Sequence, residues 1–150
     1  MLGPREGHNA VRLGEAGPSA GSALIIDASS ADVYNLSTGK FSATSSPVNG
    51  SRGAVWLTGS ESVLLTDGAN SQFYEIGRGI FRLGGPVVPQ FGAFTATRLN
   101  TTPDRSEVLF VGNRAGTSTS AAAIFSGMNA GGPCTAAAQC ISGSLSLIHI

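Results

Sequence analysis

The chain has 150 residues, of which 41% are hydrophobic and 12% are charged, and its 9 basic and 9 acidic residues give a formal net charge of zero. This length suits one ordinary domain, and charges that cancel and are scattered argue against nucleic acid or an anionic membrane surface as a partner. No apolar run approaches the ~20 residues that a membrane-spanning helix needs, and residues 1–20 carry no apolar core of a secretion signal.

Short strands are predicted along most of the chain. Val, Ile, Thr and aromatic residues gather in short runs, and turn residues, among them many of the 21 Gly and 7 Pro, lie between the runs. The predicted strands cover residues 10–13, 24–27, 33–35 and 41–44, then 54–57, 63–67, 73–75 and 80–83, and then 96–99, 108–112 and 123–125. Helix-friendly stretches are limited to residues 121–123 and 136–138, so we expect an all-β fold.

These strands recur as three similar segments. Equivalent positions of the first two segments lie 40 residues apart: Asp27 and Asp67, Tyr34 and Tyr74, Phe41 and Phe81. The third segment is longer because of turn-like insertions at residues 101–105 and 113–121. A period of about 40–50 residues with four short strands per copy is typical of β-propeller blades. The sequence therefore predicts an incomplete β-propeller of about three four-stranded antiparallel blades, at residues 4–48, 49–88 and 89–126.

Two further features of the sequence are expected of stacked blades: continuous apolar strands and glycines in the hairpins. Residues 24–26 and 63–65 are continuous apolar runs, which we expect to be buried on both faces between adjacent sheets. Residues 38–39 and 77–79 supply glycines where a tight hairpin needs a positive φ. Because each blade is an antiparallel meander, local pairing is sufficient and no crossover helix is needed.

Part of this pattern resembles a known repeat. Pro-Arg-x-Gly-His at residues 4–8, Val-Tyr-Asn at 33–35 and Ser-Thr-Gly-Lys-Phe at 37–41 resemble a kelch-type repeat, most closely the kind in galactose-oxidase-like propellers, and the likeness extends over residues 4–126. The diagnostic Gly-Gly pair of that family is replaced by Asp27-Ala28, Asp67-Gly68 and Gly112-Asn113, and a Trp of the last strand is replaced by Phe41 and Phe81.

The resemblance does not carry the oxidase activity onto this chain. The copper-radical site of that family needs a Cys–Tyr thioether and two His ligands. His8 is the one credible histidine, since His149 belongs to the last six residues, and neither Cys134 nor Cys140 lies in a blade. Residues 17–21, Gly-Pro-Ser-Ala-Gly, match G-x-S-x-G, but a nucleophile elbow lies between a strand and a helix and no helix is predicted here, and an H-E-x-x-H motif is absent from the sequence. We therefore assign no catalytic, metal-binding or cofactor-binding residue and expect no cofactor.

Both ends of the sequence indicate that the natural protein extends further. Closure of a propeller takes at least about four blades, whereas this chain shows three, so we expect further blades outside it. Residues 145–150, LSLIHI, match the in-frame translation of a transposase adapter used in sequencing libraries, which predicts that they are not native. The alternative is an ordinary terminal β-strand with alternating apolar residues.

Residues 127–144 form a Gly- and Ala-rich linker that contains both cysteines of the chain, Cys134 and Cys140. Two cysteines cannot complete a four-ligand zinc site, and their spacing differs from the C-x-x-C redox motif. The stretch resembles the start of a Cys-rich module found in surface and secreted proteins of myxobacteria. That resemblance implies that the two cysteines form disulfides and that the compartment is oxidising. The alternative is two ordinary thiols in a loop.

The remaining candidate residues have plain structural interpretations. His8 is predicted to pack at the start of a blade, and Trp56 is predicted to lie in the core. Arg5 and Arg52 occupy equivalent positions, which predicts a repeated contact between a loop and a strand. Because propeller ligands bind at the channel mouth formed by loops, we expect a ligand surface at residues 27–31, 67–71 and 113–120.

The sequence favours a non-catalytic propeller segment of a larger secreted or cell-surface bacterial protein, with a binding or scaffolding role and a protein or carbohydrate partner. Low charge, the blade repeats and the cysteine segment motivate this interpretation. Two alternatives remain open, because a fold does not imply a function. One is a fragment of a propeller enzyme, galactose-oxidase-like or glycan-active, whose active site lies outside this chain. The other is an intracellular kelch adaptor.

Overall fold

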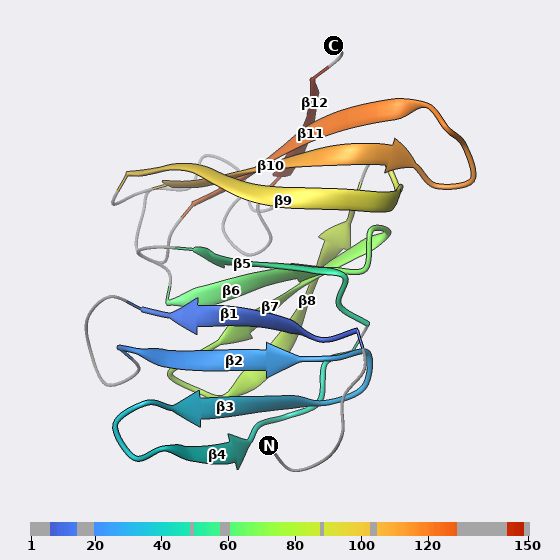
Figure 1. Ribbon diagram of the computed structural model, residues 1–150. Helices are drawn as coiled ribbons and strands as arrows, with labels where there is room; N and C mark the ends of the chain where they lie inside the picture. Colours follow the sequence, from blue (N-terminus) through green and yellow to red (C-terminus); the bar gives the residue numbers. More distant parts are fainter. Residues whose placement is uncertain are drawn as a thin grey trace.

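The computed structural model describes residues 7–14, 20–48, 50–57, 61–87, 89–102, 105–128 and 144–148, which form three antiparallel sheets (Figure 1). Sheet 1 contains β1 (Asn9–Leu13), β2 (Ser22–Ile26), β3 (Ala31–Asn35) and β4 (Lys40–Ala43). Sheet 2 contains β5 (Gly53–Leu57), β6 (Ser62–Thr66), β7 (Asn70–Glu75) and β8 (Ile80–Pro86). Sheet 3 contains β9 (Phe91–Thr102), β10 (Arg105–Arg114), β11 (Ser120–Met128) and β12 (Ser144–Ile148).

Strands that follow one another in the chain pair side by side, so each sheet is a four-stranded meander. This order needs only short connections, as expected of antiparallel strands. The predicted all-β fold of three four-stranded antiparallel units is confirmed. Over the described ranges there is no helix with the length and apolar character needed to cross a bilayer.

Aspartate side chains shape the turns after the second strand of sheets 1 and 2. In the β2–β3 turn, Asp27 Oδ1 accepts hydrogen bonds from the backbone N–H groups of Ser29 and Ser30, at 2.8 and 2.7 Å. In the β6–β7 turn, Asp67 Oδ1 accepts two equivalent bonds at 2.7 and 2.6 Å. A side chain that mimics a backbone acceptor in this way favours a tight turn over a longer loop. The 40-residue sequence repeat is therefore a repeat of turn chemistry.

Glycines close the next hairpin of each of these two sheets. Gly39 in the β3–β4 hairpin has a φ of 66°, and Gly79 in the β7–β8 hairpin has a φ of 65°. Each donates its N–H to the carbonyl four residues earlier, on Asn35 at 2.9 Å and on Glu75 at 2.8 Å. Because residues with a Cβ adopt this conformation at a cost, the glycines predicted for both hairpins have the expected role.

The three sheets follow one another in a stack in which the first strands are neighbours. β1 lies beside β5, and β5 lies beside β9. Figure 1 shows sheet 2 between sheets 1 and 3, so the described sheets do not close into a ring. Successive four-stranded meanders with their first strands side by side make a propeller-like, incomplete arrangement.

Two apolar clusters hold the stack together, one on each side of sheet 2. The cluster between sheets 1 and 2 contains the buried residues Val11, Leu13, Leu24, Ile26, Ala31, Val63, Leu65 and Tyr74. The cluster between sheets 2 and 3 contains the buried residues Leu57, Leu64, Val87, Phe91, Val108, Phe110, Ala123 and Phe125. Removal of such apolar surface from water is the main favourable term in folding, so the contacts between sheets, more than the pairing within them, stabilise this arrangement.

β6 has both faces covered, because successive side chains of a strand point to opposite sides. Val63 and Leu65 belong to the cluster facing sheet 1, and Leu64 belongs to the cluster facing sheet 3. All three side chains are at most 2% exposed. The two-sided burial predicted for residues 63–65 is confirmed.

The outer sheets are covered on one face only. In β2, Leu24 and Ile26 are fully buried towards sheet 2, whereas Ile25 points the other way and is half-buried. In β10, Phe110 is 1% exposed and Val111 is 46% exposed. The two-sided burial predicted for β2 therefore holds on one face, because sheet 1 has a single neighbouring sheet in the described part of the chain.

Sheet 3 differs from its predicted blade in two places. β12 supplies a fourth strand from beyond the predicted boundary at residue 126, with Leu145 opposite Phe125. The insertion predicted as a turn at residues 101–105 instead lengthens β9 and β10, whose pairing is shifted by a bulge between Ser106 and Val108. Since an open sheet edge accepts any extended segment, the non-native origin of residues 145–150 stays a prediction.

Candidate functional site

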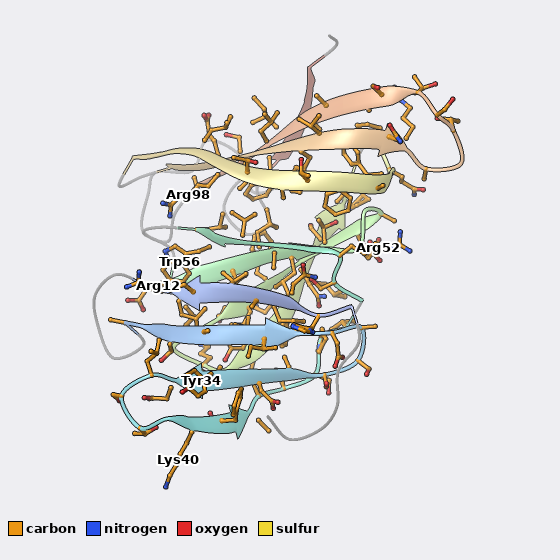
Figure 2. The ribbon with its side chains drawn as sticks, in the orientation of Figure 1. Arg12, Tyr34, Lys40, Arg52, Trp56 and Arg98 are labelled. Atoms are coloured by element: carbon orange, nitrogen blue, oxygen red, sulfur yellow. The ribbon has the colours of Figure 1, made fainter. Side chains whose placement is uncertain are left out.

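The first strands of the three sheets share a local sequence. Residues 10–13 read Ala-Val-Arg-Leu, residues 54–57 read Ala-Val-Trp-Leu and residues 96–99 read Ala-Thr-Arg-Leu. Because β1, β5 and β9 are consecutive neighbours, equivalent positions of these stretches line one surface. The third position of each stretch brings together Arg12, Trp56 and Arg98 (Figure 2).

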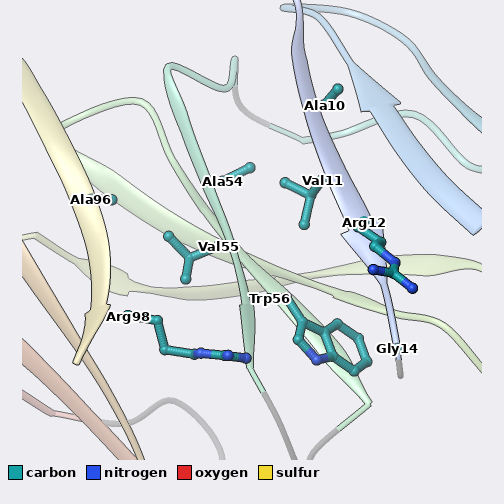
Figure 3. Close-up of a pocket in the computed structure, with 9 residues that line it drawn as sticks. All are labelled: Ala10, Val11, Arg12, Gly14, Ala54, Val55, Trp56, Ala96 and Arg98. Carbon is teal, nitrogen blue, oxygen red and sulfur yellow. The ribbon is translucent and has the colours of Figure 1, made fainter. Parts of the chain in front are cut away.

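An open groove of about 400 Å³ runs across these three strands. Ala10, Ala54 and Ala96, at the first position of each stretch, contribute to its wall (Figure 3). Such small side chains leave room between neighbouring strands, whereas the large side chains at the third position stand at one end of the groove. The repeat itself therefore produces both the hollow and the cluster of functional groups beside it.

Trp56 stands at one end of the groove with an arginine on either side. Figure 3 shows its indole between the guanidinium groups of Arg12 and Arg98. The indole is partly buried because it also packs against the cluster between sheets 1 and 2, and both arginines are exposed. The prediction that Trp56 lies in the core therefore holds in part: one side of its ring packs against the cluster, and the ring also lines the groove.

The chemistry of the groove favours an anionic ligand. Among the residues that the structure describes, nine line the groove, and they include Arg12 and Arg98 and no acidic side chain. A guanidinium keeps its charge over the whole physiological pH range and presents a planar set of N–H donors that matches a carboxylate or a sulfate. The adjacent indole offers a flat apolar surface. The arrangement suits a ligand that carries an anionic group next to a flat apolar face.

The loops predicted to hold a ligand lie at the opposite end of the first strands. The β2–β3 and β6–β7 turns, at residues 27–31 and 67–71, follow strand ends that pair with the beginnings of β1 and β5. Figure 2 shows Arg52 at that end of the stack and the groove's arginines at the other. A ligand role for these loops stays a prediction, and the groove is a separate surface.

The carboxylates of these turns serve the turns themselves. Burial alone would raise the pKa of Asp67, but hydrogen bonds from the backbone N–H groups of Asn70 and Ala69 outweigh it and hold the pKa of Asp67 below its ordinary value. Asp27 accepts the corresponding bonds in its own turn. Both side chains therefore have a structural role that explains their place in the repeat.

Replacement of Asp67 by Ala should lower the free energy of unfolding at pH 7 by about 1 kcal/mol, since it removes the acceptor of the turn. A carboxyl group whose pKa is lowered on folding contributes stability that is present above its unfolded pKa and is lost as the pH falls through its folded pKa. The difference in urea midpoint between Asp67→Ala and the parent chain should therefore shrink below about pH 4. A difference that stays constant from neutral pH to about pH 2.5 would contradict this assignment.

Arg52 makes the contact that its position predicts. Its Nη1 donates a hydrogen bond to the carbonyl oxygen of Gly92 at 3.1 Å, which joins the beginning of β5 to the beginning of β9. Asn9 Nδ2 makes a similar link from β1 to the carbonyl oxygen of Ser51, at 3.0 Å. The predicted contact between a loop and a strand is confirmed for Arg52, and its counterpart Arg5 lies outside the described residues.

His8 is exposed just before β1, so the prediction that it packs at the start of the blade is wrong. A side chain at this point precedes the first paired residue, Asn9, and lies outside the sheet. Cys134, Cys140 and His149 lie outside the described residues. Among the residues that the structure describes, no three His, Cys, Asp or Glu side chains gather into a group that could hold a metal ion.

Arg12 and Arg98 were the site residues that sequence reasoning missed. The signal was present, because each arginine interrupts an apolar inner strand at the repeat position that Trp56 occupies in the second copy. Comparisons with known proteins add no family: no family model matches the chain, and a search of curated proteins finds no match.

Proposed function

We propose that this chain is a non-catalytic, ligand-binding segment of a kelch-like propeller in a larger secreted or cell-surface bacterial protein, and that its groove binds an acidic carbohydrate. One observation carries the proposal: Arg12, Trp56 and Arg98, the same position of three successive repeats, stand together at one end of an open groove in which none of the described lining residues is acidic.

Binding, as opposed to chemistry, follows from the side chains that line the groove. Guanidinium groups do not release protons near neutral pH, so they orient and neutralise an anion without acting as an acid or a base. An indole contributes apolar contact area and has no nucleophilic group. The groove thus supplies the two elements of recognition, charge and a flat surface, and an acidic sugar presents both.

The open shape of the groove favours an extended ligand. It crosses three strands from three sheets, so successive units of a chain-like molecule could contact successive repeats. A carbohydrate with one carboxylate or sulfate per unit would meet an arginine at the first and the third strand and the indole between them. A kelch-like identity is supported by the 40-residue repeat and the sequence resemblance.

The extracellular location is proposed from the segment that contains the two cysteines. Cys134 and Cys140 resemble the beginning of a Cys-rich module of surface proteins, and the two cysteines are proposed to be disulfide-bonded. The complete gene tests this part: an export or lipoprotein leader upstream and further cysteines downstream would support it. A cytosolic start without either would refute the extracellular assignment and leave the groove proposal intact.

Calorimetric titration tests the ligand. Oligomers of galacturonic acid should bind, and neutral galactose oligomers of the same length should bind more weakly, with a salt dependence expected for exposed charges. Replacement of Arg98 by Gln should weaken binding of the acidic oligomer about tenfold, as expected for loss of one charge-assisted contact.

Arg78→Gln is the matched control, because Arg78 is an exposed arginine of the β7–β8 hairpin that pairs with Glu75 away from the groove. It should leave binding of the acidic oligomer unchanged. Equal binding of neutral and acidic oligomers, or equal effects of Arg98→Gln and Arg78→Gln, would overturn the proposal.

A further inference from the structure

The groove is bordered by the edges of the three sheets as well as by side chains. β1, β5 and β9 each stand at the edge of a sheet and pair with one strand, so the other edge of each has no hydrogen-bonded strand among the described sheets (Figure 1). An edge of this kind presents backbone N–H and C=O groups that no ladder takes up. We call these three edges the inner edges, since β1, β5 and β9 lie next to one another where the sheets meet.

The hydrogen-bond register of sheet 2 shows which residues of β5 face its inner edge. In an antiparallel ladder, opposed residues alternate between hydrogen-bonded and non-bonded pairs. The N–H of Asp67 donates to the carbonyl oxygen of Asn70 at 3.3 Å, which sets the bonded pairs between β6 and β7. Every second residue back along β6 also bonds to β7, so Leu65 bonds to β7 and Leu64 bonds to β5.

Two residues of β5 direct their backbone groups towards the groove. Leu64 pairs with Val55, so Val55 directs its N–H and C=O into the sheet. Ala54 and Trp56, on either side of Val55, therefore direct theirs to the inner edge, and both residues line the groove. Each adds one N–H donor and one C=O acceptor to the wall of the groove.

The neighbouring repeats have the same register. In sheet 3, Arg114 donates its N–H to the carbonyl oxygen of Thr119 at 2.9 Å, and the alternation from this pair places the backbone groups of Ala96 at the inner edge of β9. In sheet 1, the N–H of Asp27 closes the β2–β3 turn at 3.0 Å and places those of Ala10 at the inner edge of β1. The alanine of every repeat thus has its backbone groups on the groove side, beside a small methyl group (Figure 3).

A longer propeller would leave the inner edges open, because blades are arranged around a central channel and do not pair with one another there. β5 shows this within the chain. Sheets 1 and 3 lie on either side of sheet 2, and the inner edge of β5 still has no bonded strand among the described sheets. The backbone groups at this edge are therefore a property of the repeat that further blades would not remove.

We propose that the backbone groups of the inner edges bind hydroxyl groups and thereby restrict the groove to polyhydroxylated ligands, an inference that rests on the proposed function of the groove. Arginine and tryptophan side chains alone would also suit an aromatic acid, which has an anionic group and a flat apolar face. A hydroxyl group both donates and accepts, so it pairs with neighbouring C=O and N–H groups. An aromatic ring would instead cover these groups and leave them without a partner, which costs free energy. The inner edges therefore favour a sugar over an aromatic acid.

An ester at Ala54 tests this inference, because incorporation of lactic acid at this position replaces the peptide N–H by oxygen and keeps the methyl side chain. In calorimetric titration, oligomers of galacturonic acid and neutral galactose oligomers should both bind about fivefold more weakly, as expected for the loss of one hydrogen bond. Naphthoate, an anion with a flat apolar face and no hydroxyl group, should bind more weakly than the acidic oligomer, and the ester should not weaken its binding further.

The same ester at Ala43 is the matched control. Ala43 is exposed on β4, the strand at the opposite edge of sheet 1 from β1. Its N–H also faces away from the neighbouring strand, because the next residue, Thr44, is the one bonded to Ala31 at 3.2 Å. This ester should leave the binding of all three ligands unchanged. Circular dichroism and the urea midpoint check that each variant is folded, and an ester at Ala96 replaces the one at Ala54 if that variant is not.

The outcomes separate this inference from the proposed function. If the acidic oligomer binds more tightly than the neutral one but the esters at Ala54 and Ala43 have equal effects, the inference is wrong and the acidic ligand stands. If the ester at Ala54 weakens both oligomers equally and the acidic one has no advantage, the inference stands and the acidic ligand is wrong. An equal loss of naphthoate binding would also refute the inference, since the effect would then not depend on hydroxyl groups.

Discussion

Replacement of Gly68 by Ala is expected to lower the free energy of unfolding by about 2–4 kcal/mol. Gly68 has a φ of +96°, and an added Cβ would overlap the carbonyl oxygen of Phe91 and lie 3.3 Å from the ring of Phe94. The carbonyl of Gly68 also accepts a hydrogen bond from the N–H of Phe91 at 2.8 Å. A shift that relieves the overlap would therefore weaken a bond between the β6–β7 turn and sheet 3. Urea unfolding measures the loss.

Gly39→Ala is the control that separates the effect of backbone strain from the effect of the close contact between Gly68 and Phe91. Gly39 has a similar positive φ, +66°, but nothing lies within 4 Å of an added Cβ. Its substitution should cost about 1 kcal/mol, the backbone strain alone. If the two variants lose equal stability, the turn at Gly68 does not touch sheet 3 as closely as the structure places it.

The parts of the fold that could be predicted are those that local chemistry determines. Asp27 and Asp67 form their turns with N–H groups two and three residues away, and Gly39 and Gly79 close hairpins within five residues. Such features recur wherever the sequence recurs, so a 40-residue period predicts repeated four-stranded units without knowledge of their neighbours.

The parts that could not be predicted depend on which surfaces meet. Arg12 and Arg98 are far apart in the sequence and become a site only because β1, β5 and β9 lie side by side. Similarly, Val111 belongs to an apolar run that looks fully buried, and it is 46% exposed because no described sheet packs on that face. The periodicity of a sequence predicts which side chains of a strand point to the same face, but it does not predict how many of the two faces another sheet covers.

Replacement of Leu65 by Ala is expected to lower the free energy of unfolding by about 3 kcal/mol, the cost of a large cavity in a packed core. Leu65 is 0% exposed and lies in the cluster between sheets 1 and 2. Its loss should reduce the contact between these sheets more than the pairing of β6 with its neighbours in sheet 2. Urea unfolding gives the magnitude, and hydrogen exchange should show the largest loss of protection in β1, β2 and β6.

Ile25→Ala completes the test, because Ile25 occupies in sheet 1 the position of Leu65 in sheet 2: the two residues pair with Ala10 and Ala54 respectively. Ile25 is half-buried, so its truncation should cost about 1 kcal/mol. Truncation at the same strand position then lowers the free energy of unfolding by different amounts in the two sheets, because a neighbouring sheet covers Leu65 and no described sheet covers Ile25. If Ile25→Ala costs as much as Leu65→Ala, the face of sheet 1 that is turned away from sheet 2 is already covered, and stacking between sheets does not explain the stability of this chain.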